Sequence, residues 1–207
     1  MTPARVMIRY AGYRNLERAL RTEKNKRELS PQHSALGCCY SMDYDFFMGE
    51  ALKEARTALS LGEFPVGCVM VYRERVVARG RRKGTVDGGG NELDHAEMVA
   101  LRRLAKMKLG TETAAITAFC TMEPCLMCFS ALMLHGIGEI AYAYEDPMGG
   151  GTACQRSQLN PLYRDSRIVV CGGVRRKESL ALFKSFFSDR THRYWSASQL
   201  AEYTLKQ

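Results

Sequence analysis

Several features are missing from this 207-residue sequence, and each absence narrows the range of functions. No apolar run approaches the roughly 20 residues of a membrane-spanning helix, so we expect no association with a membrane. Residues 1–30 lack the continuous apolar core of a secretory leader. We therefore expect the eight cysteines to stay reduced in the cytoplasm and to form no disulfide framework.

The positive charge of the chain is concentrated near its N-terminus. The formal net charge is +8, and residues 1–41 carry eight basic and three acidic side chains. These residues are predicted to form a basic N-terminal extension. Four interpretations stay open: a disordered extension that contacts nucleic acid, a translation start assigned too early with Met42 as the true start, a targeting peptide, or an extra helix.

The hydrophobic pattern predicts one α/β domain over residues 42–190. Asp43 is the expected cap of the first helix, and Gly62 is expected to follow its end. Strands are predicted at 66–71, 76–78, 114–119, 140–144 and 167–171, with later helices at about 95–107, from Pro124 onward and around 180–187. Residues 191–207 are expected to form a C-terminal tail. This order predicts a layered fold in which helices cover a five-stranded sheet.

Two short motifs together predict a metal site. They are His95-Ala96-Glu97 and Pro124-Cys125-Leu126-Met127-Cys128. Cys125 and Cys128 are three positions apart on the first turn of a predicted helix, so their sulfurs face one side. The positive end of that helix favours the thiolate form. With His95 they supply three ligands for one Zn²⁺ per chain and leave a fourth position for the catalytic water, which is typical of a catalytic site.

Glu97 is the expected catalytic residue. A carboxylate beside such a metal takes a proton from water and returns protons to a ring nitrogen and to a departing amine. The combination of H-x-E with P-C-x-x-C is the signature of zinc nucleobase deaminases. The sequence therefore predicts a hydrolase that acts on the carbon–nitrogen bond of a nucleobase amidine.

The stretch from about residue 43 to residue 188 resembles the tRNA-specific adenosine deaminases of the cytidine-deaminase-like superfamily. The matching pieces are Phe64-Pro65-Val66-Gly67, His95-Ala96-Glu97-Met98-Val99-Ala100-Leu101, Met122-Glu123-Pro124-Cys125-Leu126-Met127-Cys128, Asp146, Gly172-Gly173-Val174 and Phe186-Phe187. The resemblance implies a three-layer α/β/α fold with a five-stranded mixed sheet, and a homodimer. It also implies that the substrate is adenosine at the wobble position of tRNA, which is converted to inosine.

The expected substrate-binding residues are Phe64, Pro65, Val66, Arg82, Ala96, Pro124 and Asp146. Asp146 is expected either to contact the substrate backbone or to cap a turn. Arg82 stands where the family usually has an asparagine at the end of the second strand. This exchange replaces a neutral donor and acceptor with a cation that has no acceptor.

Two other functions stay open beside tRNA editing. The first is deamination of a free base, nucleoside or nucleotide of the guanine, adenosine or cytidine type, because Arg82 could meet a phosphate or a carbonyl. The second is a non-catalytic zinc protein that binds nucleic acid, against which the intact Glu97 argues. For the two motif cysteines alone, a structural zinc site or a redox pair is the alternative, and the sequence has no second C-x-x-C to complete a structural site.

Overall fold

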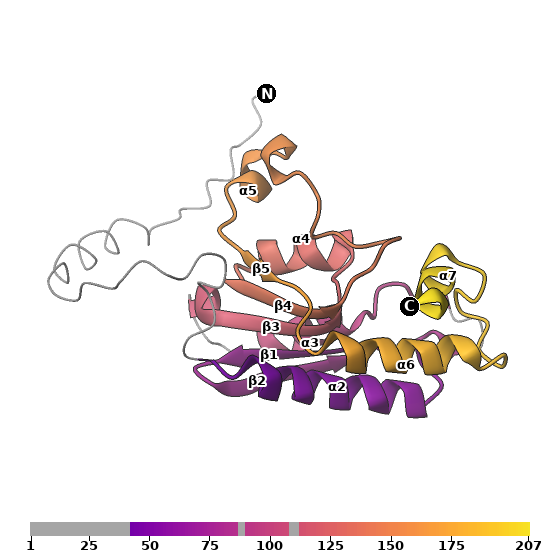
Figure 1. Ribbon diagram of the computed structural model, residues 1–207. Coiled ribbons are helices and arrows are strands. Elements are labelled where there is room, and N and C mark those ends of the chain that lie inside the picture. Colours follow the sequence, from indigo (N-terminus) through magenta and orange to yellow (C-terminus); the bar gives the residue numbers. More distant parts are fainter. Residues whose placement is uncertain (1–41, 87–89, 108–111) are drawn as a thin grey trace, which may run out of the picture. The chain divides into compact units, whose positions relative to one another are not determined.

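The computed structural model describes residues 42–86, 90–107 and 112–207, which all fall in one compact unit (Figure 1). The interpretations of residues 1–41 therefore lie outside the described residues. The helices are α2 (Tyr44–Ser60), α3 (Ala96–Ala105), α4 (Leu126–Leu134), α5 (Pro161–Arg164), α6 (Arg176–Ser188) and α7 (Gln199–Lys206), with 3-10 turns η2 (Glu112–Ala115) and η3 (Arg156–Gln158). Within the described ranges no helix is long and apolar enough to cross a membrane.

Five strands form one mixed sheet. They are β1 (Gly67–Tyr72), β2 (Arg75–Arg81), β3 (Ile116–Met122), β4 (Glu139–Tyr144) and β5 (Val169–Cys171), and their order across the sheet is β2-β1-β3-β4-β5. β1 pairs antiparallel with both β2 and β3, whereas β3, β4 and β5 run parallel. The parallel part places the loops after β3 and β4 at the same edge of the sheet, where α/β folds commonly bind ligands.

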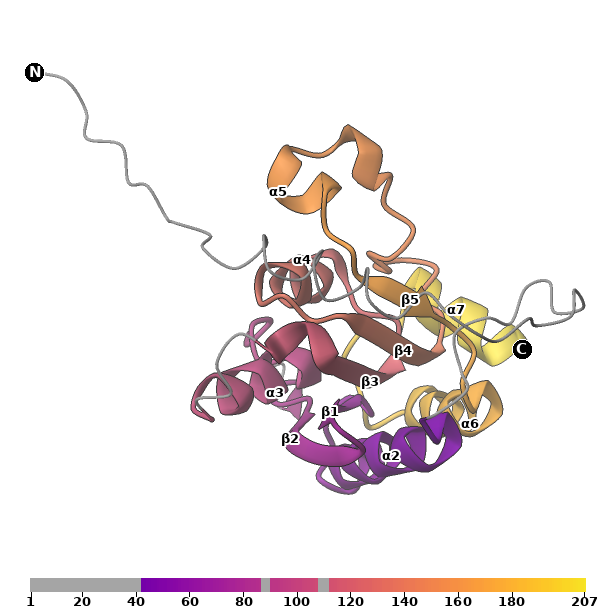
Figure 2. The ribbon, with the colours of Figure 1, turned by 90° about the vertical axis from the view of Figure 1, so that its left-hand side faces the viewer.

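Alternating side chains of β1 separate the two faces of the sheet. Val69 and Val71 belong to a core cluster with α2, whereas Cys68 and Met70 belong to the larger cluster that includes α3 and α4. In Figure 2, α2 and α6 lie on one side of the sheet and α3 and α4 on the other. The predicted three-layer α/β/α fold with a five-stranded sheet is confirmed.

The first helix begins and ends at the residues that the sequence indicates. The Asp43 carboxylate accepts a hydrogen bond of 2.8 Å from the backbone N–H of Phe46 and so caps α2. Gly62 follows the helix with φ +76°, a left-handed conformation that glycine adopts without a steric penalty. Between these two caps, α2 presents an apolar face to the sheet.

Four predictions of secondary structure need correction. Ala114 and Ala115, expected at the start of the third strand, belong to η2, and β3 continues to Met122, three residues beyond its expected end. β2 continues to Arg81, three residues beyond its expected end. Pro124 does not open α4, because Cys125 is the N-cap and the helix begins at Leu126. The helix around 180–187 is not the last one, because residues 191–207 contain α7 in addition to a loop. Leu200, at the start of α7, is buried against the main core.

Candidate active site

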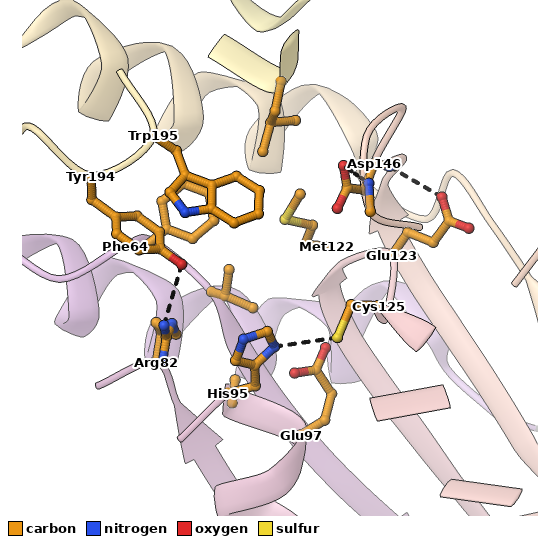
Figure 3. A pocket seen from close by; sticks show the side chains of 14 residues that line it. Phe64, Arg82, His95, Glu97, Met122, Glu123, Cys125, Asp146, Tyr194 and Trp195 are labelled. Atoms are coloured by element: carbon orange, nitrogen blue, oxygen red, sulfur yellow. Dashed lines mark hydrogen bonds between the residues drawn. The ribbon is translucent and has the colours of Figure 1, made fainter. Parts of the chain in front are cut away.

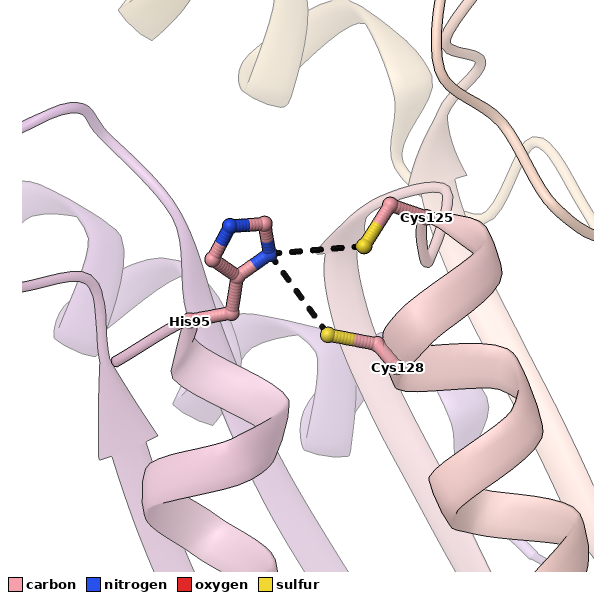
Figure 4. Close-up of side chains that lie close together, drawn as sticks. All are labelled: His95, Cys125 and Cys128. Carbon is pink, nitrogen blue, oxygen red and sulfur yellow. Dashed lines mark hydrogen bonds between the residues drawn. The ribbon is translucent and has the colours of Figure 1, made fainter. Parts of the chain in front are cut away.

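Two helix N-termini meet at the edge of the sheet and carry the motif residues. His95 is the N-cap of α3, and Cys125 is the N-cap of α4, which follows directly after β3. Cys128 lies in the first turn of α4, so its sulfur faces the same side as that of Cys125 (Figure 4). The local chain conformation therefore positions the three side chains, because each one lies where a loop ends and a helix begins.

The distances between the three side chains fit a zinc ion. The Nδ1 atom of His95 lies 3.5 Å from the sulfur of Cys125 and 3.5 Å from that of Cys128, and the three ligand atoms lie within 4.8 Å of one another. Tetrahedral zinc, with Zn–S and Zn–N bonds of about 2.3 and 2.0 Å, separates a nitrogen and a sulfur ligand by about 3.5 Å. Both the donor set and its spacing suit Zn²⁺.

The electrostatics differ between the two cysteines, because their thiols share a hydrogen bond: the pKa of Cys125 is lowered and that of Cys128 is raised. The Cys128 thiol donates a hydrogen bond that lowers the pKa of Cys125 to about 4, and His95 adds to this effect. Cys125 is therefore a thiolate at neutral pH, the form that binds metals. On the other side of the imidazole ring, Nε2 of His95 lies 3.6 Å from a carboxylate oxygen of Glu92. Such a carboxylate orients a metal-binding histidine through its second nitrogen.

Glu97 lies beside the ligands in the first turn of α3. Its side chain is 3% exposed, and Oε2 lies 3.5 Å from the Cys128 sulfur. Burial raises the pKa of Glu97. A raised pKa suits a carboxylate that takes and returns protons near neutral pH. Glu97 and His95 both line the same pocket, because the first turn of a helix directs neighbouring side chains toward its end (Figure 3).

A pocket of about 80 Å³ opens above these residues. It is lined by Phe64, Val66, Arg82, His95, Ala96, Glu97, Met122, Glu123, Cys125, Asp146, Gly149, Tyr194, Trp195 and Leu200. Of the expected substrate-binding residues, the structure brings together Phe64, Val66, Arg82, Ala96 and Asp146 around this pocket. Pro65 and Pro124 are buried beside it and do not line it.

The loop after β4 shapes one wall of the pocket. Oδ1 of Asp146 accepts hydrogen bonds of 2.9 Å from the backbone N–H groups of Met148 and Gly149, so Asp146 caps a turn. Burial raises the pKa of Asp146. Glu123, which follows β3, accepts hydrogen bonds from the backbone N–H groups of Asp146 and Thr152 and holds the loop against the site.

Arg82 has its partners within the chain. Its guanidinium is 2% exposed, and Nη1 donates to the carbonyl oxygens of Lys83 and Asn91, at 2.7 Å each. Nη2 donates to Glu92 at 2.9 Å and to the Tyr194 hydroxyl at 3.3 Å. A buried cation bonded in this way supports the pocket wall, and contact of Arg82 with a substrate group stays a prediction.

The sequence analysis did not identify the aromatic wall. Tyr194 and Trp195, from the expected tail, line the pocket together with Leu200 of α7. In the sequence, only the adjacent pair Tyr194 and Trp195 in a polar segment indicates this role. Large aromatic residues are seldom fully exposed, so such a pair indicates a segment that packs against the domain.

Comparisons with known proteins agree with this geometry. Residues 41–144 match the family model for the cytidine and deoxycytidylate deaminase zinc-binding region. The chain is 34% identical to tRNA-specific adenosine deaminase 2 of Xenopus laevis over 152 residues, which cover 68% of this chain and 84% of the relative. It is 30% identical to the tRNA-specific adenosine deaminase of Bacillus subtilis over 146 residues, covering 70% and 89% of the two chains.

A solved structure from a study of A-to-I editing by tRNA:A34 deaminases at the wobble position of transfer RNA has the same fold. It is 28% identical, with a TM-score of 0.54, and the match covers 66% of this chain and 98% of that chain. The pocket, the three converging ligands and these relatives lead to one assignment. The protein is a zinc-dependent hydrolytic deaminase, and it belongs to the tRNA-specific adenosine deaminase family of the cytidine-deaminase-like superfamily.

Proposed function

We propose that this enzyme converts adenosine to inosine at the wobble position of tRNA, with His95, Cys125 and Cys128 as the zinc ligands and Glu97 as the catalytic residue. The observation that carries the proposal is a buried carboxylate beside three converging metal ligands in one pocket. The relatives named tRNA-specific adenosine deaminase support the choice of substrate.

The reaction replaces the exocyclic amine of adenine with oxygen from water and releases ammonia. Zinc, when bound by three protein ligands, supplies a Lewis acid that lowers the pKa of a water molecule in its fourth position. Glu97 accepts the proton that this water loses and passes it to the ring nitrogen next to the reacting carbon. The water oxygen bonds to the carbon that carries the amine. The hydroxyl formed there gives its proton through Glu97 to the amine, the C–N bond breaks, and ammonia leaves.

Other lining residues bind and orient the base in this proposal. Phe64, Val66 and Ala96 present apolar surface to it. Asp146 contributes Oδ2 at the rim, because Oδ1 is engaged by the turn. We also propose a cytoplasmic homodimer. Sedimentation analysis of the purified protein tests the dimer, and a monomer at micromolar concentration would exclude it.

The substrate is tested by assaying ammonia release and inosine formation with five candidates. These are tRNA with adenosine at the wobble position, free adenosine, guanine, cytidine and cytosine. Of these five candidates, we expect the enzyme to deaminate only the tRNA. Turnover of a free base or nucleoside without RNA would overturn the tRNA assignment and favour the small-molecule alternative.

The role of Glu97 is tested by a variant and a matched control. Glu97→Ala should keep one zinc per chain and lose ammonia release by a factor on the order of 100 to 10,000. Glu112→Ala removes an exposed carboxylate whose ion pair with Arg73 lies outside the pocket, and it should leave the rate unchanged. An active Glu97→Ala enzyme would contradict the proposed proton transfer.

A further inference from the structure

The C-terminal loop between α6 and α7 supplies a wall of the pocket that the zinc-binding motifs do not account for. We propose that the substrate base stacks on Trp195, and that Arg82, acting through Glu92 and Tyr194, is the positioning residue that holds this indole in place. The inference rests on the proposed function, because the stacked base is the one to be deaminated. In Figure 3, Trp195 lies across the pocket from His95 and Glu97.

Trp195 presents aromatic surface to the pocket. Its indole is stacked with the ring of Tyr194 at a centroid separation of 5.5 Å and an angle of 27°, and 40% of the residue remains exposed. Tyr194 in turn packs edge-on against Phe64, at 5.4 Å. The indole is therefore supported from within the protein, while part of its surface is left for a ligand. Every nucleobase has a π-face that can stack on such a ring.

The backbone of Trp195 is held in an uncommon conformation. Its φ is +54°, in the left-handed region that bulky residues rarely adopt. The loop is fixed on both sides, because the His192 ring stacks on Phe186 at 4.3 Å and the Ser198 hydroxyl caps α7 through the N–H of Ala201. Backbone strain of this kind clusters at ligand sites, where the surrounding structure maintains it. The loop is a preformed wall.

A hydrogen-bonded network around the buried Arg82 side chain connects the aromatic wall to the half-exposed Glu92 beside His95. The Tyr194 hydroxyl donates to Glu92 at 3.0 Å and accepts from Arg82 at 3.3 Å, and the Arg82 guanidinium lies 5.6 Å from the Tyr194 ring centroid. Glu92 pairs with Arg82 at 2.9 Å and lies 3.6 Å from Nε2 of His95. One carboxylate thus contacts both Tyr194, which supports the stacking surface, and the side chain of His95. The base is held between the stacking surface and His95.

The single tryptophan of the chain makes this proposal directly measurable, because its fluorescence reports Trp195 alone. The zinc-loaded Glu97→Ala variant is titrated with an anticodon stem-loop RNA that carries adenosine at the wobble position, and a dye on the RNA reports binding independently. We expect the RNA to quench the tryptophan emission and to protect it from acrylamide. Binding of the RNA with unchanged emission and unchanged acrylamide quenching would overturn the proposal.

Kinetics of the full-length enzyme provide the second test. Loss of base–aromatic stacking corresponds to about 5- to 150-fold in affinity, so Trp195→Ala should raise KM by a factor in that range while zinc content stays at one per chain. Trp195→Phe should restore most of the loss. Phe46→Ala, which removes a 57% exposed aromatic ring on α2, serves as the matched control and should leave KM unchanged.

The role of Arg82 has a separate spectroscopic signature. Arg82→Met should make Trp195 more accessible to acrylamide in the free enzyme and raise KM, and it should add little to the effect of Trp195→Ala in the double variant. Additive effects with unchanged acrylamide quenching would refute the positioning role.

Failure of this inference can be told apart from failure of the proposed function. If wild-type enzyme forms inosine in tRNA and Trp195→Ala has the same KM, the stacking proposal is wrong and tRNA editing stands. If wild-type enzyme forms no inosine but the stem-loop still quenches Trp195, the stacking proposal stands and the assigned reaction is wrong.

Discussion

The close approach of α3 to β2 leads to a specific prediction about the active site. Gly80, in β2, lies under the first turn of α3, and a Cβ atom at this position would be 2.0 Å from the carbonyl oxygen of Ala96. Ala96 stands between His95 and Glu97 in the sequence. We predict that Gly80→Ala displaces the proposed zinc ligand His95 and the proposed catalytic carboxylate of Glu97 together.

The size of the effect follows from the geometry. Real Cβ contacts are essentially never shorter than 3.0 Å, so α3 must shift by about 1 Å, the difference between 3.0 and 2.0 Å. A misplacement of about 1 Å costs about 100-fold in rate, or about 2.7 kcal/mol of transition-state stabilisation. Overpacking should also lower the free energy of unfolding by about 1–3 kcal/mol.

Gly67→Ala is the matched control for this experiment. A Cβ atom at Gly67 of β1 would be 2.2 Å from the carbonyl oxygen of Ala51 in α2, which carries none of the proposed site residues. Both variants should lose similar stability in denaturant unfolding. Gly80→Ala alone should release zinc more readily to a chelator and lose deamination rate. If both variants keep the same zinc affinity and rate, the position of α3 does not set the ligand geometry.

Three further predictions concern the metal, the RNA and the C-terminal helix. Cys125→Ala should bind less than one zinc per chain by metal analysis and melt at a lower temperature, because metal binding stabilises the folded form; a full equivalent of zinc would show that the ligand set is wrong. Arg193→Ala removes an exposed cation of the loop between α6 and α7. It should weaken tRNA binding and reduce the slope of the logarithm of the binding constant against the logarithm of the salt concentration by about one. An unchanged slope would show that Arg193 does not contact a phosphate. Glu145 has its pKa lowered to about 2 by hydrogen bonds from Arg176 and from Tyr203 of α7. The stabilising effect of the Glu145 carboxylate is therefore complete above about pH 4.5 and disappears as the pH falls toward 2. Between these pH values the melting temperature of the wild type should fall more steeply with acid than that of Glu145→Gln. An equal fall in both proteins would exclude this contribution.

The parts of the fold that depend on local patterns were predictable from the sequence. The apolar run that contains Val69 and Val71 indicates a buried strand, and Asp43 and Gly62 delimit the first helix through their capping chemistry. The metal site was predictable for the same reason, because each ligand lies in a short motif at a helix start. The relative positions of residues within a short motif depend mainly on the local backbone conformation and little on distant residues.

Features that depend on distant partners were not predictable. β2 extends to Arg81, and its basic residues Arg79 and Arg81 form ion pairs with Glu50 and Glu54 of α2, at 2.6 and 3.2 Å. Similarly, Tyr194 becomes part of the pocket through contacts with residues about a hundred positions earlier. Hydrophobic periodicity carries no information about such pairs.

The sharing of Glu92 among three groups has an evolutionary consequence. Its carboxylate bonds to Arg82 and Tyr194 and lies beside His95, so a change at any one of these positions alters the surroundings of the others. Replacing Arg82 alone with a neutral residue would remove the cation that pairs with Glu92 and donates to the Tyr194 hydroxyl beside His95. We therefore expect positions 82, 92 and 194 to covary among homologues, so that a lineage with asparagine at position 82 also has different residues at the other two.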